Sequence, residues 1–172
     1  MRLAAAALAL VLSGCATIAT PPASAPTFDA ATMVRAIRSA GAALPTEVEV
    51  QPLQDALVSD LRQQATREAQ AGRIDAASAT LDRAIAERPQ EPALLQERAE
   101  LALLTHRTDA AFDFARRAHA VGPTVGPLCR RSLETLVQIE RLRASTDPAA
   151  ATRADAFARQ RDACTVKPPA RY

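Results

Sequence analysis

Residues 58–91 read VSDLRQQATREAQAGRIDAASATLDRAIAERPQE, and residues 92–125 read PALLQERAELALLTHRTDAAFDFARRAHAVGPTV. When the second stretch is aligned beneath the first, like residues coincide in the pairs Leu61/Leu95, Ala65/Ala99, Ala77/Ala111, Ala84/Ala118 and Pro89/Pro123. Small side chains allow two antiparallel helices to approach closely, and proline ends a helix because it lacks an N–H donor. A repeat of about 34 residues therefore predicts helical hairpins stacked on one another.

The pattern resembles the tetratricopeptide repeat (TPR), a two-helix unit, in two copies over about 58–91 and 92–125. In this register Gly72 and His106 fall in the turn between the two helices of each unit. The chain departs from the family where the repeat carries large aromatic residues, at positions held here by Leu61, Glu68, Leu95 and Ala102.

Helical periodicity begins shortly before the first unit. Leucine and alanine recur at every fourth position, at Leu53, Leu57, Leu61 and Ala65, which predicts one apolar stripe along a helix. We therefore expect the helical domain to begin at about residue 53.

Residues 126–165 predict a third hairpin, which lacks the repeat signature. Apolar residues recur at helical spacing in its first half, at Cys129, Leu133, Leu136, Ile139 and Leu142. Asp147 followed by Pro148 is typical of the start of a helix, which we expect to end near Cys164. We therefore predict an all-α fold, a TPR-like α-solenoid of about three antiparallel hairpins over 53–165, with an extended N-terminal tether.

The N-terminal segment has the pattern of an export signal. Arg2 precedes ten apolar residues, 3–12, which are too few to span a bilayer, since that takes about 20. The residues Leu12-Ser13-Gly14-Cys15 resemble the lipobox of bacterial lipoproteins. The resemblance implies that the signal peptide 1–14 is removed and that Cys15 becomes the lipidated first residue. An ordinary signal peptide cleaved elsewhere, or a buried Ala-rich helix, is the alternative.

The residues after the lipobox indicate where the protein is held. Ala16, in place of Asp, resembles the pattern of lipoproteins of the outer membrane, here facing the periplasm. Several acyl chains, palmitate among them, anchor a protein firmly, whereas one chain holds it only marginally. We expect residues 15–27 to form the lipidated Cys and a flexible tether. Residues 28–52 are expected to form a short helix over 28–41 and a linker, and 166–172 a flexible tail.

Two further cysteines, Cys129 and Cys164, are expected to form a disulfide in the oxidising exported compartment. Asp147, at the expected turn, lies almost midway between them in the sequence. At about 1.5 Å per helical residue, both thiols lie about 26 Å from the turn and level with each other. Two buried free thiols are the alternative. A redox-active pair is disfavoured because the Cys-x-x-Cys spacing is missing.

Composition and motifs argue against several function classes. The 21 basic and 19 acidic residues are interspersed, whereas a nucleic-acid binder shows a strongly basic face. His106 and His119, the only histidines, have no cysteine or paired acid at metal-ligand spacing. The sequence also contains neither a nucleophile elbow nor a Gly-rich phosphate loop. We expect no enzyme activity, no cofactor, no metal, no small-molecule substrate and no nucleic acid.

In TPR proteins the first helix of each unit lines a concave groove that binds protein partners. Transfer of those positions through the repeat register predicts the partner-binding residues Arg62, Thr66, Gln96, Glu100, Leu103, Arg130 and Glu134. Arginine and carboxylate side chains in a groove suit the capture of an extended or helical peptide through charge-assisted hydrogen bonds.

The sequence therefore predicts a lipid-anchored periplasmic adaptor that recruits a protein partner in cell-envelope processes. By resemblance to known lipoproteins with such repeats, these processes include pilus assembly, outer-membrane protein assembly, division and the control of peptidoglycan hydrolases or proteases. The alternative is a structural subunit of a larger envelope complex without an open peptide groove. In that alternative the helix at 28–41 packs on a neighbouring protein.

Overall fold

The computed structural model describes residues 28–45, 47 and 55–165 of the 172. Within these residues the chain forms only helices: α1 (Ala30–Ala40), α2 (Ala56–Gln70), α3 (Ile74–Glu87), α4 (Pro92–Leu104), α5 (Thr108–Val121), α6 (Pro127–Arg143) and α7 (Pro148–Ala163). This confirms the all-α prediction for the described part of the chain. The predictions for the signal peptide, for Cys15 and its tether and for the C-terminal tail lie outside the described residues.

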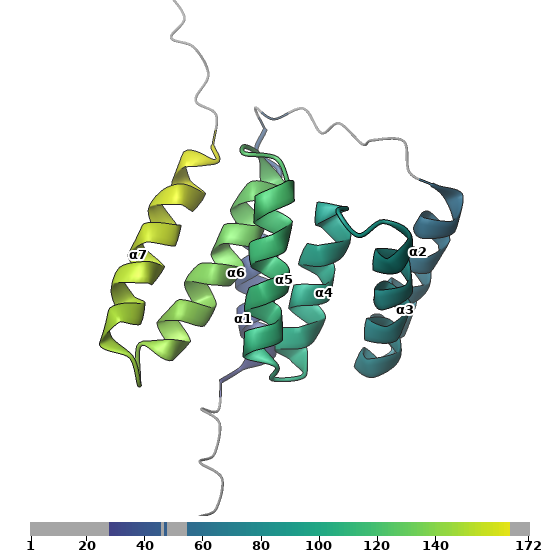
Figure 1. The fold of residues 1–172 in the computed structure, drawn as a ribbon, viewed down its shortest axis with the longest axis horizontal. Coiled ribbons are helices and arrows are strands. Elements are labelled where there is room, and N and C mark those ends of the chain that lie inside the picture. The colour runs from purple at the N-terminus through teal and green to yellow at the C-terminus, as the bar shows by residue number, and fades with distance from the viewer. Residues whose placement is uncertain (1–27, 46, 48–54, 166–172) are drawn as a thin grey trace, which may run out of the picture.

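Three antiparallel hairpins, α2–α3, α4–α5 and α6–α7, stand side by side as predicted (Figure 1). Their first helices, α2, α4 and α6, form one face of the stack, called here the first-helix face. None of the described helices is long and apolar enough to cross a membrane.

The repeat is visible in the backbone of the two inter-helix turns. Gly72 and His106 both adopt left-handed conformations, with φ of 76° and 57°. The next residue in each turn donates its N–H to the carbonyl five residues earlier, from Arg73 to Glu68 at 2.9 Å and from Arg107 to Ala102 at 2.8 Å. This is the hydrogen-bonding pattern of a helix that ends at a left-handed residue.

The repeated small residues lie in the core, where they were expected. All of the leucine and alanine pairs that define the repeat are buried. The predicted stripe along α2 is wrong at Leu57, which is half exposed, while its neighbour Val58 is buried. The helix starts at Ala56, after the capping Asp55, so its inward face follows the 3.6-residue period through Val58, Leu61 and Ala65.

The third hairpin has the predicted start of its second helix. Asp147 caps α7 by accepting a hydrogen bond from the N–H of Ala149 at 2.9 Å, and Pro148 is the first helical residue. Cys129, in the first turn of α6, is bonded to Cys164, at the end of α7, with an S–S distance of 2.02 Å and a Cα–Cα distance of 5.8 Å. The disulfide thus joins the ends of this hairpin that lie away from its turn.

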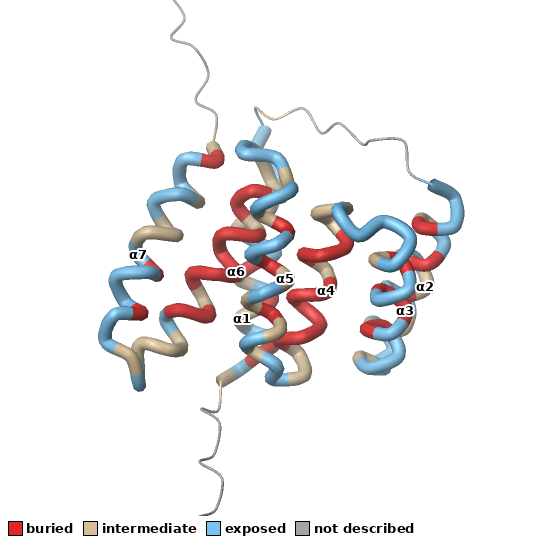
Figure 2. The backbone as a smooth tube through the Cα atoms, viewed as in Figure 1, coloured by how far each residue is buried: buried red, intermediate tan, exposed pale blue. Residues whose placement is uncertain are grey.

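Helix α1 packs across the first-helix face, against α4 and α6 (Figure 1). Its residues Val34 and Ile37 are buried in a cluster with Leu103 of α4 and Ile139 of α6. With α1 in place, α4 and α6 are buried over most of their length (Figure 2). The helix that the structural-subunit alternative assigned to a neighbouring protein therefore packs within its own chain.

Candidate partner-binding groove

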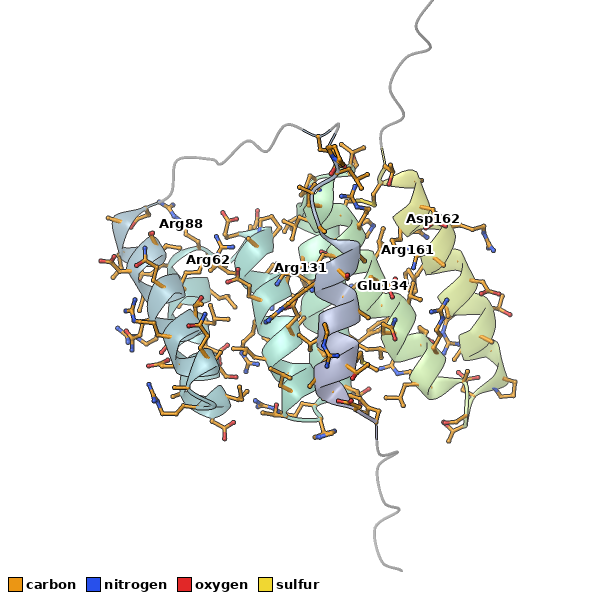
Figure 3. The ribbon with its side chains drawn as sticks, turned by 180° about the vertical axis from the view of Figure 1, so that it is seen from behind. Arg62, Arg88, Arg131, Glu134, Arg161 and Asp162 are labelled. Atoms are coloured by element: carbon orange, nitrogen blue, oxygen red, sulfur yellow. A yellow bond between two sulfur atoms is a disulfide. The ribbon has the colours of Figure 1, made fainter. Side chains whose placement is uncertain are left out.

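An open groove of about 320 Å³ lies on the first-helix face between α2 and α4, bordered by α1 and α6. Its lining residues come from all four helices and from α3: Arg38, Ala65, Thr66, Ala69, Gln70, Leu81, Glu97, Leu101, Leu104 and Arg131. We call it the α2–α4 groove. It continues the surface on which α1 lies, on the side of α1 that faces α2 (Figure 3).

The floor of the groove is apolar because of the residue types on its two walls. Helix α2 contributes the small side chains of Ala65 and Ala69, and α4 contributes Leu101 and Leu104. Helix α2 packs mainly on its partner α3, and α3 packs on α4. The side chains of alanine are too short to fill the space that remains between α2 and α4, so a hollow is left.

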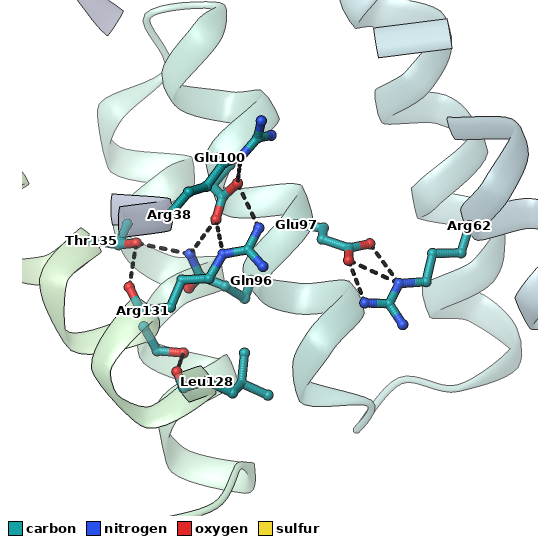
Figure 4. Close-up of polar contacts among 9 residues, drawn as sticks. Arg38, Arg62, Gln96, Glu97, Glu100, Leu128, Arg131 and Thr135 are labelled. Atoms are coloured by element: carbon teal, nitrogen blue, oxygen red, sulfur yellow. Dashed lines mark hydrogen bonds and ion pairs between the residues drawn. The ribbon is translucent and has the colours of Figure 1, made fainter. Parts of the chain in front are cut away.

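An ion pair bridges the two walls of the groove. Arg62 of α2 donates from Nε to Oε1 of Glu97 on α4 at 2.8 Å and from Nη2 at 2.5 Å (Figure 4). The hydrogen bond to Glu97 is the main reason that the pKa of Arg62 lies above its ordinary value. A bidentate pair of this kind fixes the spacing of two helices that make few other contacts.

A buried carboxylate, Glu100 of α4, ties α1 and α6 to the groove. Its Oε2 accepts hydrogen bonds from Arg38 Nε of α1 and Arg131 Nη2 of α6, each at 2.8 Å (Figure 4). Oε1 accepts from Arg131 Nε and from Gln96 Nε2. The Glu100 side chain is only 1% exposed. Helices α1, α4 and α6 therefore share one anion.

The electrostatics of this cluster keep Glu100 ionised. Burial acts to raise the pKa of its carboxyl, but the hydrogen bonds and charge of Arg131, with the hydrogen bonds of Arg38 and Gln96, outweigh burial. The pKa of Glu100 therefore lies below its ordinary value. Two guanidinium groups then face one carboxylate, which leaves one positive charge in excess at this end of the groove.

The structure corrects the exposure expected for five of the predicted partner-binding residues. These five are buried on the first-helix face or beside it: Gln96, Glu100, Leu103, Arg130 and Glu134. The physical reason is α1, which covers the groove between α4 and α6, and α7, which supplies a partner for Glu134. Each of the five side chains packs against, or hydrogen-bonds to, other residues of this chain and is not exposed to a partner.

Arg130 and Glu134 show how these residues are engaged. The guanidinium of Arg130 donates to the backbone carbonyls of Ala40 and Ala42, at 3.0 and 2.8 Å, and pairs with the carboxylate of Glu47. Glu134 pairs with Arg161 of α7 (Figure 3). Arg130 therefore holds the end of α1 in place, and Glu134 holds the third hairpin together.

Two of the predicted residues remain beside open space. Thr66 lines the α2–α4 groove, and Arg62 borders it through its pair with Glu97. Arg38 and Arg131 were not among the predicted site residues. Arg131 lies one repeat length, 34 residues, after Glu97 and directly follows the predicted Arg130. The repeat register therefore contained a signal for Arg131. No sequence signal places Arg38 there, because the docking of α1 is a long-range contact.

Comparison with known proteins identifies a likeness of fold. The structure of the globular C-terminal domain of P. aeruginosa LpoP is similar to this chain with a TM-score of 0.52. The match has 24% sequence identity and covers 60% of this chain and 99% of that domain. No protein-family model matches the sequence, and no curated protein matches it. The helical stack of this chain therefore shares its fold with the LpoP domain.

Proposed function

We propose that this protein is a lipid-anchored adaptor of the bacterial cell envelope that binds a protein partner in the α2–α4 groove. The observation that carries the proposal is the groove itself, an open hollow with an apolar floor and a charged border on the face where TPR units bind their partners. The lipobox at residues 12–15 supports the anchor, and Ala16, in place of Asp, supports a location at the outer membrane facing the periplasm.

The chemistry of the groove favours a peptide segment as its ligand. Alanine and leucine side chains on the floor offer apolar contact, and Thr66, Gln70 and the arginines at the border offer hydrogen bonds. A hollow of about 320 Å³ holds a few side chains of a helix or an extended segment, which anchors the partner while its backbone stays outside. The proposal includes no catalytic step and no cofactor.

The position of α1 supports an adaptor over a purely structural subunit. Helix α1 follows directly on the segment that we expect to carry the anchor, and its Arg38 borders the groove. Binding in the groove would therefore take place beside the helix that is nearest to the expected anchor in the sequence. Since α1 packs on α4 and α6 of its own chain, it does not need a neighbouring protein to bury its apolar face.

Site-specific photo-crosslinking in cells tests the groove. A photoreactive amino acid at Thr66 or Gln70, both exposed in the groove, is expected to crosslink one defined envelope protein. The same amino acid at Arg159, exposed on α7 far from the groove, is the matched control. Equal crosslinking at all three positions would refute the assignment of the groove.

Metabolic labelling tests the anchor separately. Labelled palmitate should be incorporated into the wild-type protein, and the substitution Cys15→Ala should abolish incorporation. A protein that is unlabelled yet folded would remove the anchor from the proposal and leave the groove in place.

A further inference from the structure

The positive charges at the α2–α4 groove outnumber the negative charges. Arg62 and Glu97 form a neutral pair, while Arg38 and Arg131 share the single carboxylate of Glu100. The three guanidinium groups and two carboxylates leave one positive charge in excess at the border of the groove. A ligand that carries a negative charge complements it.

Donor groups are also left over at this end of the groove. Among the hydrogen bonds of the described residues, Arg38 uses only its Nε, and Arg131 uses Nε and Nη2. Both Nη groups of Arg38 and Nη1 of Arg131 therefore remain as donors. The Arg38 side chain is 57% exposed, so its free donors can reach a ligand in the groove. A carboxylate accepts such donors in pairs.

Helix α1 shows how a helix lies on this face. Its apolar residues Val34 and Ile37 pack onto α4 and α6. Arg38, next to Ile37 in the sequence, donates a hydrogen bond to Glu100 of α4. The α2–α4 groove is the next groove along the same face, and its floor of Ala65, Ala69, Leu101 and Leu104 is likewise apolar. A second helix in it would lie beside α1 and pack its apolar residues on that floor.

We infer that the α2–α4 groove takes an amphipathic helix of the partner protein, one that presents an Asp or Glu carboxylate to Arg38 and Arg131. The inference rests on the proposed function and adds the chemistry of the ligand. A second copy of α1 does not meet the requirement, because the helix Ala30–Ala40 carries two arginines and no acidic residue.

Selection from a peptide library supplies the probe. Full-length protein in detergent micelles is used to select from displayed helical peptides with a fixed apolar stripe and random residues elsewhere. We expect the selected peptides to share an Asp or Glu at one position relative to the stripe. One selected peptide and its Glu→Gln or Asp→Asn counterpart are then synthesised and titrated by fluorescence anisotropy.

Three variants locate the contact. The substitution Arg38→Gln is expected to weaken binding of the acidic peptide about tenfold, the loss of one charge-assisted hydrogen bond, and to leave the affinity of the amide counterpart unchanged. Because Arg131 and Gln96 still contact Glu100, and Val34 and Ile37 still pack on α4 and α6, we expect this variant to fold with α1 docked. Arg35→Gln, an exposed arginine on the same helix, is the matched control and should bind like wild type. Thr66→Trp fills the groove and should abolish binding of both peptides.

The outcomes separate this inference from the proposed function. If Thr66→Trp abolishes binding but the acid and amide peptides bind equally, the groove is the binding site and the carboxylate requirement is wrong. If Thr66→Trp changes nothing, both are wrong. If Arg38→Gln reduces binding to phosphatidylglycerol vesicles while no peptide binds, the excess charge recognises a lipid headgroup and the inference is overturned.

Discussion

The docking of α1 can be tested by shortening Ile37, the residue that fixes it. Ile37 is fully buried, in a cluster with Leu103 of α4 and Ile139 of α6. Truncation of a buried isoleucine to alanine costs about 2–5 kcal/mol, since it removes apolar contact and leaves a cavity. The structure indicates where this loss appears, because α1 contacts the rest of the chain mainly through α4 and α6.

Helix α1 has 11 residues, and an isolated helix of that length is marginal in water. Once undocked, α1 therefore unfolds, while the three hairpins keep their own core. For Ile37→Ala we expect a loss of about 3 kcal/mol in the docking free energy of α1. This corresponds to about 100-fold faster hydrogen exchange in its amides. The midpoint of urea unfolding of the hairpins should change far less.

Native-state hydrogen exchange followed by mass spectrometry measures both effects in one experiment, through peptides from 28–42 and from α2 to α7. Arg35→Ala, an exposed substitution on the same helix that keeps its propensity, is the control and should leave exchange in α1 unchanged. Equal loss of protection in α1 and in all three hairpins would show that α1 unfolds with the hairpins as one cooperative unit, which would refute independent undocking of α1.

Three further measurements test other parts of the structure. Replacing both Cys129 and Cys164 by alanine opens a loop with a sequence separation of 35, which should lower the free energy of unfolding by about 3–4 kcal/mol; an equal urea midpoint for both proteins would contradict this. The hydrogen bond from Arg130 lowers the pKa of Glu47 from 4.5 to about 2. The stabilisation that the Arg130–Glu47 pair gives to docked α1 is therefore complete above about pH 5 and lost as the pH falls toward 2. Glu47→Gln should remove this part of the pH dependence of hydrogen exchange in α1. Gly72→Ala should lower the free energy of unfolding by about 1 kcal/mol, because the φ of +76° is strained for alanine. No atom lies near the Cβ that alanine would add, so backbone strain alone opposes the substitution. An unchanged urea midpoint would rule out that strain.

The hairpins were predictable because their signals are local and repeated. The alanine and proline pairs that recur from one unit to the next are set by contacts within one unit and between neighbours, so the sequence period carries them directly. The Asp147-Pro148 start of α7 is local in the same sense. The error at Leu57 arose because a strict four-residue spacing drifts away from the 3.6-residue helical period.

The candidate site was less predictable because its key contacts are far apart in the chain. Arg38 and Glu100 are 62 residues apart, and Arg131 lies 31 residues beyond Glu100. In the sequence Glu100 looks like one of several surface acids on a helix. It is buried only because α1 and α6 bring arginines to it, and no periodic pattern reports where an 11-residue helix docks.

The cluster around Glu100 links the position of α1 to the polarity of the groove. A buried ion cluster contributes less net stability than its short distances suggest, because each charge must leave water, but it tolerates few alternative arrangements. Val34 and Ile37 hold α1 on the face through non-directional contacts, whereas we expect the directional Arg38–Glu100 pair to favour one register of the helix. That register is what leaves the spare donors of Arg38 at the border of the α2–α4 groove. A shift of α1 by one turn would keep its apolar contacts in part, but it would remove the charge that we expect a partner to recognise.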